Sequence, residues 1–255
     1  MRGYYGAAVA RPSDGDWVNR LNAAEATDLP PRRAELRRLA DATRSIIDRL
    51  VATGAPIEAV TAAADQVEGA LGALAGHPQG RLYEGFAEVG LAGGVGAEDA
   101  RSFFDHSPII GSANPLAPPV RLEIRDGAVH GTVRFGAAYE GPPNSVHGGY
   151  VAAAFDEVLG MAQSLSGNPG MTGTLEIRYR RPTPLHTDLR FEATLDRQDG
   201  RKLFTSGRLF AGEELTAEAK GLFITVDFAK IAAMMAERGS REHGAEEQVP
   251  GGLTR

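Results

Sequence analysis

The strongest constraint on the fold lies in the second half of the chain, where tight turns join strand-like segments around one helical segment. Residues 121–125 and 129–135 alternate between apolar and polar side chains, and Asp126-Gly127 between them is typical of a two-residue hairpin. Tight turns require antiparallel pairing, so we expect an α+β domain in which one helix covers one antiparallel sheet. The further strand-like runs are residues 171–181, 188–197, 201–211 and 214–227.

The helical segment runs from about His147 to Ser164. Its predicted core face consists of Val151, Phe155, Val158, Leu159, Ala162 and Leu165. Asp156 lies instead on a stripe of small residues, namely Gly149, Ala152, Ala153 and Gly160. A carboxylate among such residues indicates that another group packs or binds closely there. Glu157 points about 100° away around the helix, so it is the weaker candidate for chemistry.

The N-terminal part predicts a helical hairpin over residues 34–75. One apolar stripe contains Leu36, Leu39, Ala40, Thr43, Ile47 and Leu50, and the other contains Ile57, Val60, Ala64, Val67, Leu71 and Leu74. Thr53-Gly54-Ala55-Pro56 separates the two helices. The other predicted divisions are a loosely ordered arm (1–33), a glycine-rich linker (76–104), the α+β domain (105–228), and a short helix with a disordered tail (229–255).

Composition excludes several classes of function. The chain has no cysteine, which rules out disulfides, a cysteine nucleophile and thiolate metal sites. A net charge of −6 gives no general attraction to nucleic acid or anionic membranes. No signal-peptide pattern and no membrane-spanning apolar run is present, so we expect a cytoplasmic protein without membrane insertion. No set of His, Asp and Glu has metal-ligand spacing, and we expect neither a metal nor a cofactor.

The loop before the helix ends in His147-Gly148-Gly149. The first amides of a helix have no partner within it, and the helix dipole makes this end positive. Glycine lets a ligand oxygen approach the backbone, so this turn can polarise a carbonyl and hold an oxyanion. By itself, the same short motif is more often a simple turn and helix cap.

Several motifs taken together resemble the hotdog-fold acyl-CoA thioesterases. In order, these are Gly141-Pro142-Pro143 with His147-Gly148-Gly149, Asp156 and Gly160, Met171-Thr172, Tyr179-x-Arg181-Pro182-x-Pro184-Leu185, and Gly200-Arg201-Lys202. They are most similar to the branch that holds the animal thioesterase superfamily members four and five, and less similar to the phenylacetate-pathway thioesterases. The resemblance spans about residues 119–227, and it implies a hotdog fold, in which an antiparallel sheet wraps around one long helix.

The resemblance also implies roles for individual residues. Asp156 matches the catalytic carboxylate, acting as general base or nucleophile, and the Gly148 amide after His147 matches the oxyanion donor. Thr172 matches a threonine that helps to place the water or the carboxylate. The implied substrate contacts are Asn144, Gly149, Arg178, Arg180, Arg201 and Lys202, with the four cations placed along coenzyme A. Two matches depart from the pattern, because Asn144 is offset from the expected amide and Arg178 replaces a smaller polar residue.

Alternation along residues 171–181 suggests which of these side chains share a face. Thr172 falls on one face with Thr174, Glu176, Arg178 and Arg180, whereas Leu175, Ile177 and Tyr179 fall on the other. A polar face with two arginines suits phosphate groups.

The resulting hypothesis is a thioesterase that hydrolyses medium- or long-chain acyl-CoA, with no nucleic-acid partner. Gly148 and Asp156 lie eight residues apart, roughly 12 Å along one helix. We therefore expect a homodimer, possibly paired into a tetramer, in which each site draws on two chains. One alternative is a regulator that binds acyl-CoA without hydrolysis, although residues 1–75 carry no basic recognition helix. A hotdog hydratase or dehydratase would need a catalytic histidine beside the carboxylate, and none follows Asp156.

Overall fold

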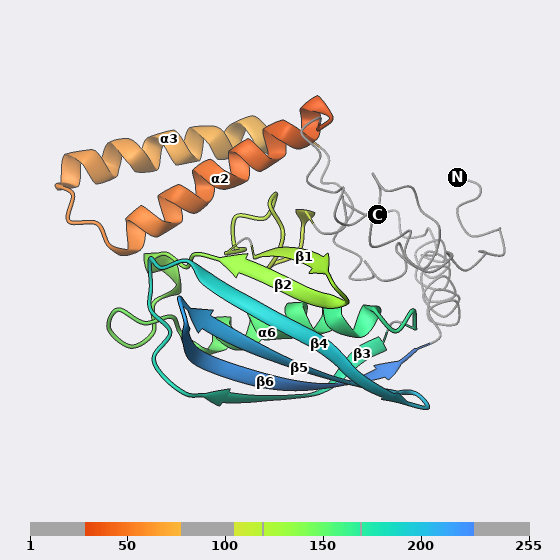
Figure 1. The fold of residues 1–255 in the computed structure, drawn as a ribbon. Coiled ribbons are helices and arrows are strands. Elements are labelled where there is room, and N and C mark those ends of the chain that lie inside the picture. Colours follow the sequence, from red (N-terminus) through yellow and green to blue (C-terminus); the bar gives the residue numbers. More distant parts are fainter. Residues whose placement is uncertain (1–28, 78–104, 119, 169, 227–255) are drawn as a thin grey trace, which may run out of the picture.

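The computed structural model describes residues 29–77, 105–118, 120–168 and 170–226. A six-stranded antiparallel sheet curves around helix α6 (Gly148–Ser164), with strand order β1-β2-β4-β5-β6-β3 (Figure 1). The predicted hotdog fold is therefore confirmed. The strands are β1 (Arg121–Arg125), β2 (Ala128–Val133), β3 (Gly170–Tyr179), β4 (Leu189–Asp199), β5 (Lys202–Ala211) and β6 (Glu214–Thr225).

The β1–β2 hairpin forms as its turn residues predict. Asp126 and Gly127 both have positive φ, 52° and 72°, as a two-residue turn that follows the sheet twist requires. The order of pairing leaves β1 and β3 at the two edges of the sheet. Edge strand β3 runs beside the exposed flank of α6, which matters for the site described below.

The core lies between α6 and the concave face of the sheet. Val151, Phe155, Val158, Leu159 and Ala162 are buried as predicted, while Leu165 is half-buried at the end of the helix. The side chain of Leu159 packs over glycines of two strands. A Cβ added at Gly207 would lie 3.1 Å from Cδ2 of Leu159, and a Cβ added at Gly221 would lie 3.3 Å from its Cδ1. Glycine at these two positions therefore lets α6 approach the sheet closely.

Strand β3 departs from the simple alternation that its sequence suggests. Its pairing with β6 shifts between Thr172 and Thr174, so Gly173 forms a bulge. One extra residue moves the side chains that precede it to the opposite face of the sheet. Thr172 consequently faces α6, and the expectation that it shares a face with Arg178 and Arg180 is wrong.

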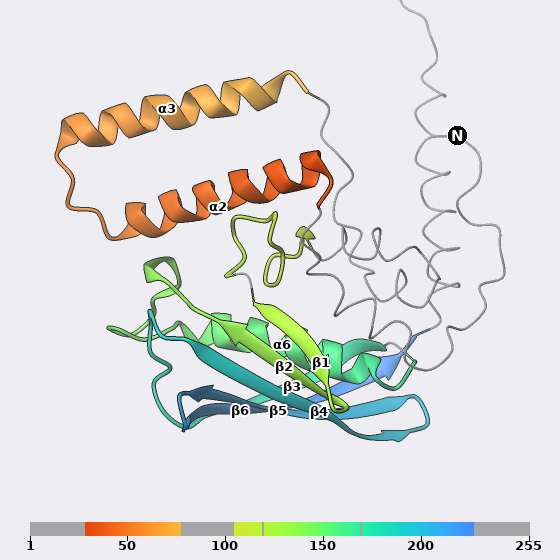
Figure 2. The ribbon, with the colours of Figure 1, turned by 45° about the horizontal axis from the view of Figure 1, so that its top comes forward.

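The N-terminal hairpin consists of α2 (Pro31–Val51) and α3 (Ile57–Ala75), which run antiparallel at one side of the sheet (Figure 2). Polar side chains attach α2 to the domain. The carboxylate of Asp105, 5% exposed, accepts hydrogen bonds from Arg33 and Arg37, the latter at 2.6 Å. The Arg44 Nε donates to the carbonyl of Ala117 at 2.7 Å.

Helix α2 turns most of its predicted stripe toward the domain. Ala40 is buried and Leu36, Thr43 and Ile47 are half-buried, whereas Leu39 and Leu50 are 41% and 62% exposed. The domain therefore covers the predicted stripe of α2 only in part. None of the described helices combines the length and apolarity needed to cross a membrane. Residues 1–28, 78–104 and 227–255 lie outside the described residues, so the predicted arm, linker and C-terminal helix stay predictions.

Replacing Asp105 should loosen the attachment of α2. Asp105→Asn leaves two guanidinium groups without their carboxylate, and we expect a loss of about 1–3 kcal/mol in the free energy of unfolding. Thermal unfolding measures the loss, and limited proteolysis should show cleavage within α2 before cleavage of the sheet.

Asp41→Asn is the matched control, because the Asp41 side chain is 70% exposed and pairs with Arg44 at the surface. An exposed ion pair contributes at most about 1 kcal/mol, so this variant should melt close to the unmodified protein. Equal effects of the two substitutions would mean that Asp105 does not anchor α2.

Candidate active site

The loop before α6 is built around a turn at Pro142–Ser145. The Ser145 amide donates to the Pro142 carbonyl at 2.9 Å, and Asn144 has a φ of 58°. Proline in the second position and a left-handed residue in the third define a type II turn. Asn144, predicted as a substrate contact, thus has a clear structural role, and its backbone amide also donates to Glu140 at 2.7 Å.

Close backbone contacts hold the end of this loop in place. The His147 amide donates to the Tyr139 carbonyl at 2.8 Å, and the Val146 amide donates to the Thr183 carbonyl at the same distance. A Cβ at Gly141 would lie 2.7 Å from the Cα of His147, so only glycine fits there. Burial raises the pKa of Tyr139 to about 12, which keeps its hydroxyl protonated as a donor to the Leu116 carbonyl.

The two glycines at the start of α6 have different roles. His147 is the N-cap, and its Nδ1 accepts a hydrogen bond from the Gly149 amide at 3.0 Å. The Gly149 amide, expected to contact substrate, is therefore already satisfied. Within the described part of the chain the Gly148 amide has no hydrogen-bond acceptor, so it is the one of the two that remains available to a ligand oxygen.

Tyr179 supports this turn from strand β3. Its hydroxyl donates to the Gly148 carbonyl at 2.8 Å, and a Cβ at Gly148 would lie 3.3 Å from the same hydroxyl. The sequence had placed Tyr179 among apolar side chains with no function. The signal that it faces the helix was present, because Tyr179 alternates in phase with Leu175 and Ile177, but nothing local indicated its partner.

The predicted carboxylate and threonine meet directly. The Thr172 hydroxyl donates to Oδ1 of Asp156 at 2.8 Å, and Asp156 is partly exposed beside Ala152, Ala153 and Gly160. Glu157 points elsewhere and accepts a hydrogen bond from Ser107 at 3.1 Å. Asp156 rather than Glu157 therefore faces the open flank of the helix, as expected.

The cations predicted to contact coenzyme A lie at opposite ends of this flank. Arg178 and Arg180 project from the outer face of β3, and both pair with Glu218, at 3.6 Å and 2.5 Å. Arg201 donates to the Thr225 carbonyl at 3.0 Å, and Lys202 pairs with Ile224 in the sheet. Thr172 pairs with neighbouring Phe223, so Arg201 and Lys202 lie at the Asp156 end, whereas Arg178 and Arg180 lie at the Gly148 end.

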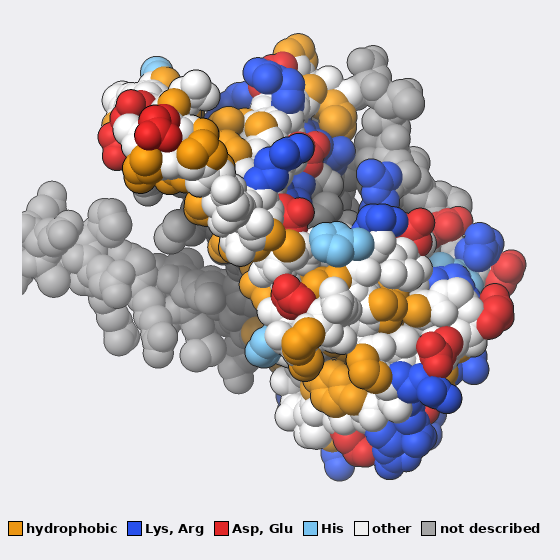
Figure 3. All heavy atoms as spheres, turned by 90° about the vertical axis from the view of Figure 1, so that its left-hand side faces the viewer, with side chains coloured by type: hydrophobic (Ala, Val, Ile, Leu, Met, Phe, Trp, Pro, Cys, Tyr) orange, Lys and Arg blue, Asp and Glu red, His pale blue; other side chains and the backbone are white. Residues whose placement is uncertain are grey.

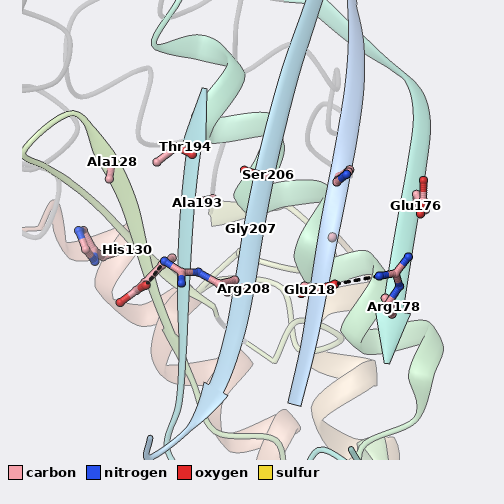
Figure 4. Close-up of a pocket in the computed structure, with 13 residues that line it drawn as sticks. Ala128, His130, Glu176, Arg178, Ala193, Thr194, Ser206, Gly207, Arg208 and Glu218 are labelled. Carbon is pink, nitrogen blue, oxygen red and sulfur yellow. Dashed lines mark hydrogen bonds and ion pairs between the residues drawn. The ribbon is translucent and has the colours of Figure 1, made fainter. Parts of the chain in front are cut away.

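The outer face of the sheet also carries a cavity of about 560 Å³, and Asp156 is not among the residues that line it (Figure 4). Its charged side chains pair with one another, as Figure 4 shows for Arg178 with Glu218 and Arg208 with Glu192. This internal pairing leaves the cavity without an evident excess of charge for a ligand. Among the described residues, no group of three or more His, Asp and Glu is arranged to hold a metal ion.

Comparison with known proteins agrees with this geometry. The sequence model of the thioesterase superfamily matches residues 143–218, which include the turn, α6 and most of the sheet. A crystal structure of a thioesterase superfamily protein is 36% identical, with a TM-score of 0.61 over 74% of this chain and 90% of that chain. The chain belongs to the thioesterase superfamily.

Two curated members of the superfamily are similar over a shorter stretch. The acyl-coenzyme A thioesterase THEM4 of Bos taurus is 39% identical over 94 residues, which cover 36% of this chain and 38% of that protein. THEM5 of Homo sapiens is 32% identical over 91 residues, covering 35% and 37%. The chain thus spans less than half the length of these relatives, and the predicted resemblance to members four and five is confirmed.

The tight packing of the turn predicts that Gly141 does not tolerate a side chain. Gly141→Ala should lower the free energy of unfolding by about 1–3 kcal/mol, because the added methyl group meets the backbone of His147. Gly160→Ala in α6 is the control, since its Cβ would meet only Phe223 at an ordinary 4.0 Å. Thermal melts of both variants test this, and equal stability of the two would contradict the tight packing of the turn.

Proposed function

We propose that this chain hydrolyses acyl-CoA thioesters to a free acid and coenzyme A. The observation that carries the proposal is the Thr172–Asp156 pair on the same exposed flank of α6 as the unpaired Gly148 amide. The names of the curated relatives, acyl-coenzyme A thioesterases, support the choice of substrate.

Asp156 would activate the attacking water or attack the thioester carbon itself. In the first route, the carboxylate removes a proton from water as the new carbon–oxygen bond forms, while the Gly148 amide stabilises the negative oxygen. The carbon–sulfur bond then breaks, and the thiolate of coenzyme A takes up the proton. Thr172 acts as a positioning residue, because its hydroxyl holds one oxygen of Asp156 and leaves the other for the reaction.

One chain alone is poorly arranged to supply both the base and the oxyanion donor to the same carbonyl. Gly148 and Asp156 occupy the same helix, about 12 Å apart along its axis, whereas a base and an oxyanion donor must both lie within about 3 Å of the reacting atoms. Thr172 and Tyr179, which contact Asp156 and Gly148, lie seven residues apart on β3, so the strand also keeps the two groups apart. We therefore infer a homodimer in which two α6 helices run antiparallel across a two-fold axis.

This dimer also unites the cations that one chain keeps apart. Asp156, Arg201 and Lys202 of one subunit would meet the turn of the partner subunit, and Arg178 and Arg180 would lie nearby on the outer face of that subunit's edge strand β3. The exposed guanidinium groups suit the phosphates of coenzyme A, which accept paired hydrogen bonds from arginine. The small residues beside Asp156 leave room for an aliphatic chain, which favours a medium- or long-chain acyl group.

Removing the carboxylate tests the chemistry. Asp156→Asn should lower turnover by about a hundred- to ten-thousand-fold, because general-base catalysis contributes that much. Thiol release from acyl-CoAs between acetyl and palmitoyl, with benzoyl- and phenylacetyl-CoA added, measures both the loss and the acyl preference. Glu157→Gln is the control and should retain activity. Hydrolysis that survives in Asp156→Asn would remove this residue from the mechanism.

Complementation tests the composite site. Gly148→Pro removes the predicted oxyanion donor, and His147 already has the φ of −60° and ψ of 130° that a residue before proline favours. This variant and Asp156→Asn should each be nearly inactive. Refolded together in equal amounts, they should regain about a quarter of the normal activity, since half of the dimers are mixed and each of those has one intact site. Mixed dimers that form but stay inactive would place the site within one chain.

A further inference from the structure

Helix α3 exposes its full apolar stripe. All of its residues from Ile57 to Ala75 are exposed, and Ile57, Leu71 and Leu74 are 69%, 67% and 55% exposed. The stripe follows a seven-residue repeat, with steps of three and four through Ile57, Val60, Ala64, Val67, Leu71 and Leu74. This spacing is typical of a helix that packs along its length against other helices.

Helix α2 carries a second apolar face that its own domain leaves open. Its arginines and Ala40 turn one side toward the domain, whereas Leu39, Ile46 and Leu50 are 41%, 46% and 62% exposed on the other side. With Ala42 between them, these residues also follow steps of three and four. Each helix thus presents one open apolar face. The α2 seam consists of Leu39, Ala42, Ile46 and Leu50, and the α3 seam is the six-residue stripe described above.

The two helices carry opposite charge. Arg33, Arg37 and Arg44 of α2 bind the domain, whereas Arg32, Arg38 and Arg49 are exposed, and Arg38 pairs with Glu35. Arg32 and Arg49 therefore give the open side of α2 positive charge, whereas α3 has Glu58, Asp65 and Glu68 and no basic residue. Figure 3 shows both acidic and basic side chains on the hairpin. A surface with one acidic and one basic helix is complementary to a copy of itself turned by a two-fold rotation.

We propose that the α2–α3 hairpin is a self-association surface, on which the hairpin of a second copy of this chain packs to form a four-helix bundle. The α2 seam of one copy lies against the α3 seam of the other, so that each basic helix meets an acidic one. The exposed large apolar side chains of the hairpin sum to on the order of 800 Å² per copy, about what one partner contributes to a stable interface.

Two physical considerations favour a second copy of the chain over other binding partners of the hairpin. A helix of 19 residues without packing is marginal in water, so α3 needs a partner surface to stay folded. The six arginines and three acids of α2 balance the three acids of α3, so the two helices together carry no net charge and have no general attraction to anionic lipid. The hairpin lies on the β1–β2 side of the sheet, whereas β3 forms the opposite edge, so the hairpin contact and the catalytic dimer use different surfaces (Figure 2).

Hydrogen exchange of the full-length protein tests whether the seam is covered. The amides of α3 should exchange at least tenfold more slowly in the unmodified protein than in a Val67→Gln, Leu71→Gln variant. The control is Ala62→Gln, Ala73→Gln, which adds two amides to the opposite side of α3 and should retain the protection. An α3 that exchanges in the unmodified protein as fast as in the seam variant would overturn the proposal.

Cross-linking shows which surface covers the seam. Because the chain has no cysteine, Ala42→Cys in the α2 seam and Ala64→Cys in the α3 seam give unambiguous disulfides. Mixed and oxidised, these two proteins should form a disulfide between copies, and Ala62→Cys on the outer side of α3 should not replace Ala64→Cys. A protected α3 without this cross-link would mean that something other than a second copy covers it. Acyl-CoA hydrolysis should persist in the Val67→Gln, Leu71→Gln variant. A loss of hydrolysis in this variant would mean that the substitutions disturb the catalytic dimer.

Discussion

Helix α6 can both fill the core and present the proposed site because it lies very close to the sheet on one side only. Gly207 and Gly221 leave the space that Leu159 fills, and this contact fixes the rotation of the helix about its axis. The small residues around Asp156 then face outward, next to edge strand β3. A bulkier residue at either glycine would push the helix off the sheet and move the carboxylate and the Gly148 amide with it.

Edge strand β3 completes the open flank through two hydrogen bonds at its two ends. Thr172 holds Asp156, and Tyr179 holds the carbonyl of Gly148, so the strand sets the positions of both functional groups on the helix. The bulge at Gly173 is what allows both contacts. Without it, either Thr172 or Tyr179 would point to the outer face, where Arg178 meets Glu218.

Hydrogen bonds from arginines attach the hairpin beside a small apolar contact around Ala40. Asp105 and the loop carbonyls near Ala117 hold the arginines of α2, while Leu39, Ile46 and Leu50 of α2 and the stripe of α3 stay open. Ion pairs in a partly buried setting give a defined orientation, because hydrogen bonds from guanidinium groups are directional. A helix that is anchored in this way presents its apolar face outward at a fixed angle, as a docking surface requires.

The sequence by itself determined the order of elements, the antiparallel sheet, the core face of α6 and the superfamily, since turn residues, periodicity and motif spacing are local properties. The role of Asp156 beside Thr172 followed from the resemblance, and the hydrogen bond between them was observed only in the fold. The tertiary structure alone decided which face of β3 carries Thr172, which of two glycine amides stays free, and which carboxylate the arginines of α2 bind. Each of these features depends on a partner elsewhere in the structure: the register with a neighbouring strand, a histidine ring nitrogen, or a buried carboxylate. A local sequence pattern cannot predict such partners.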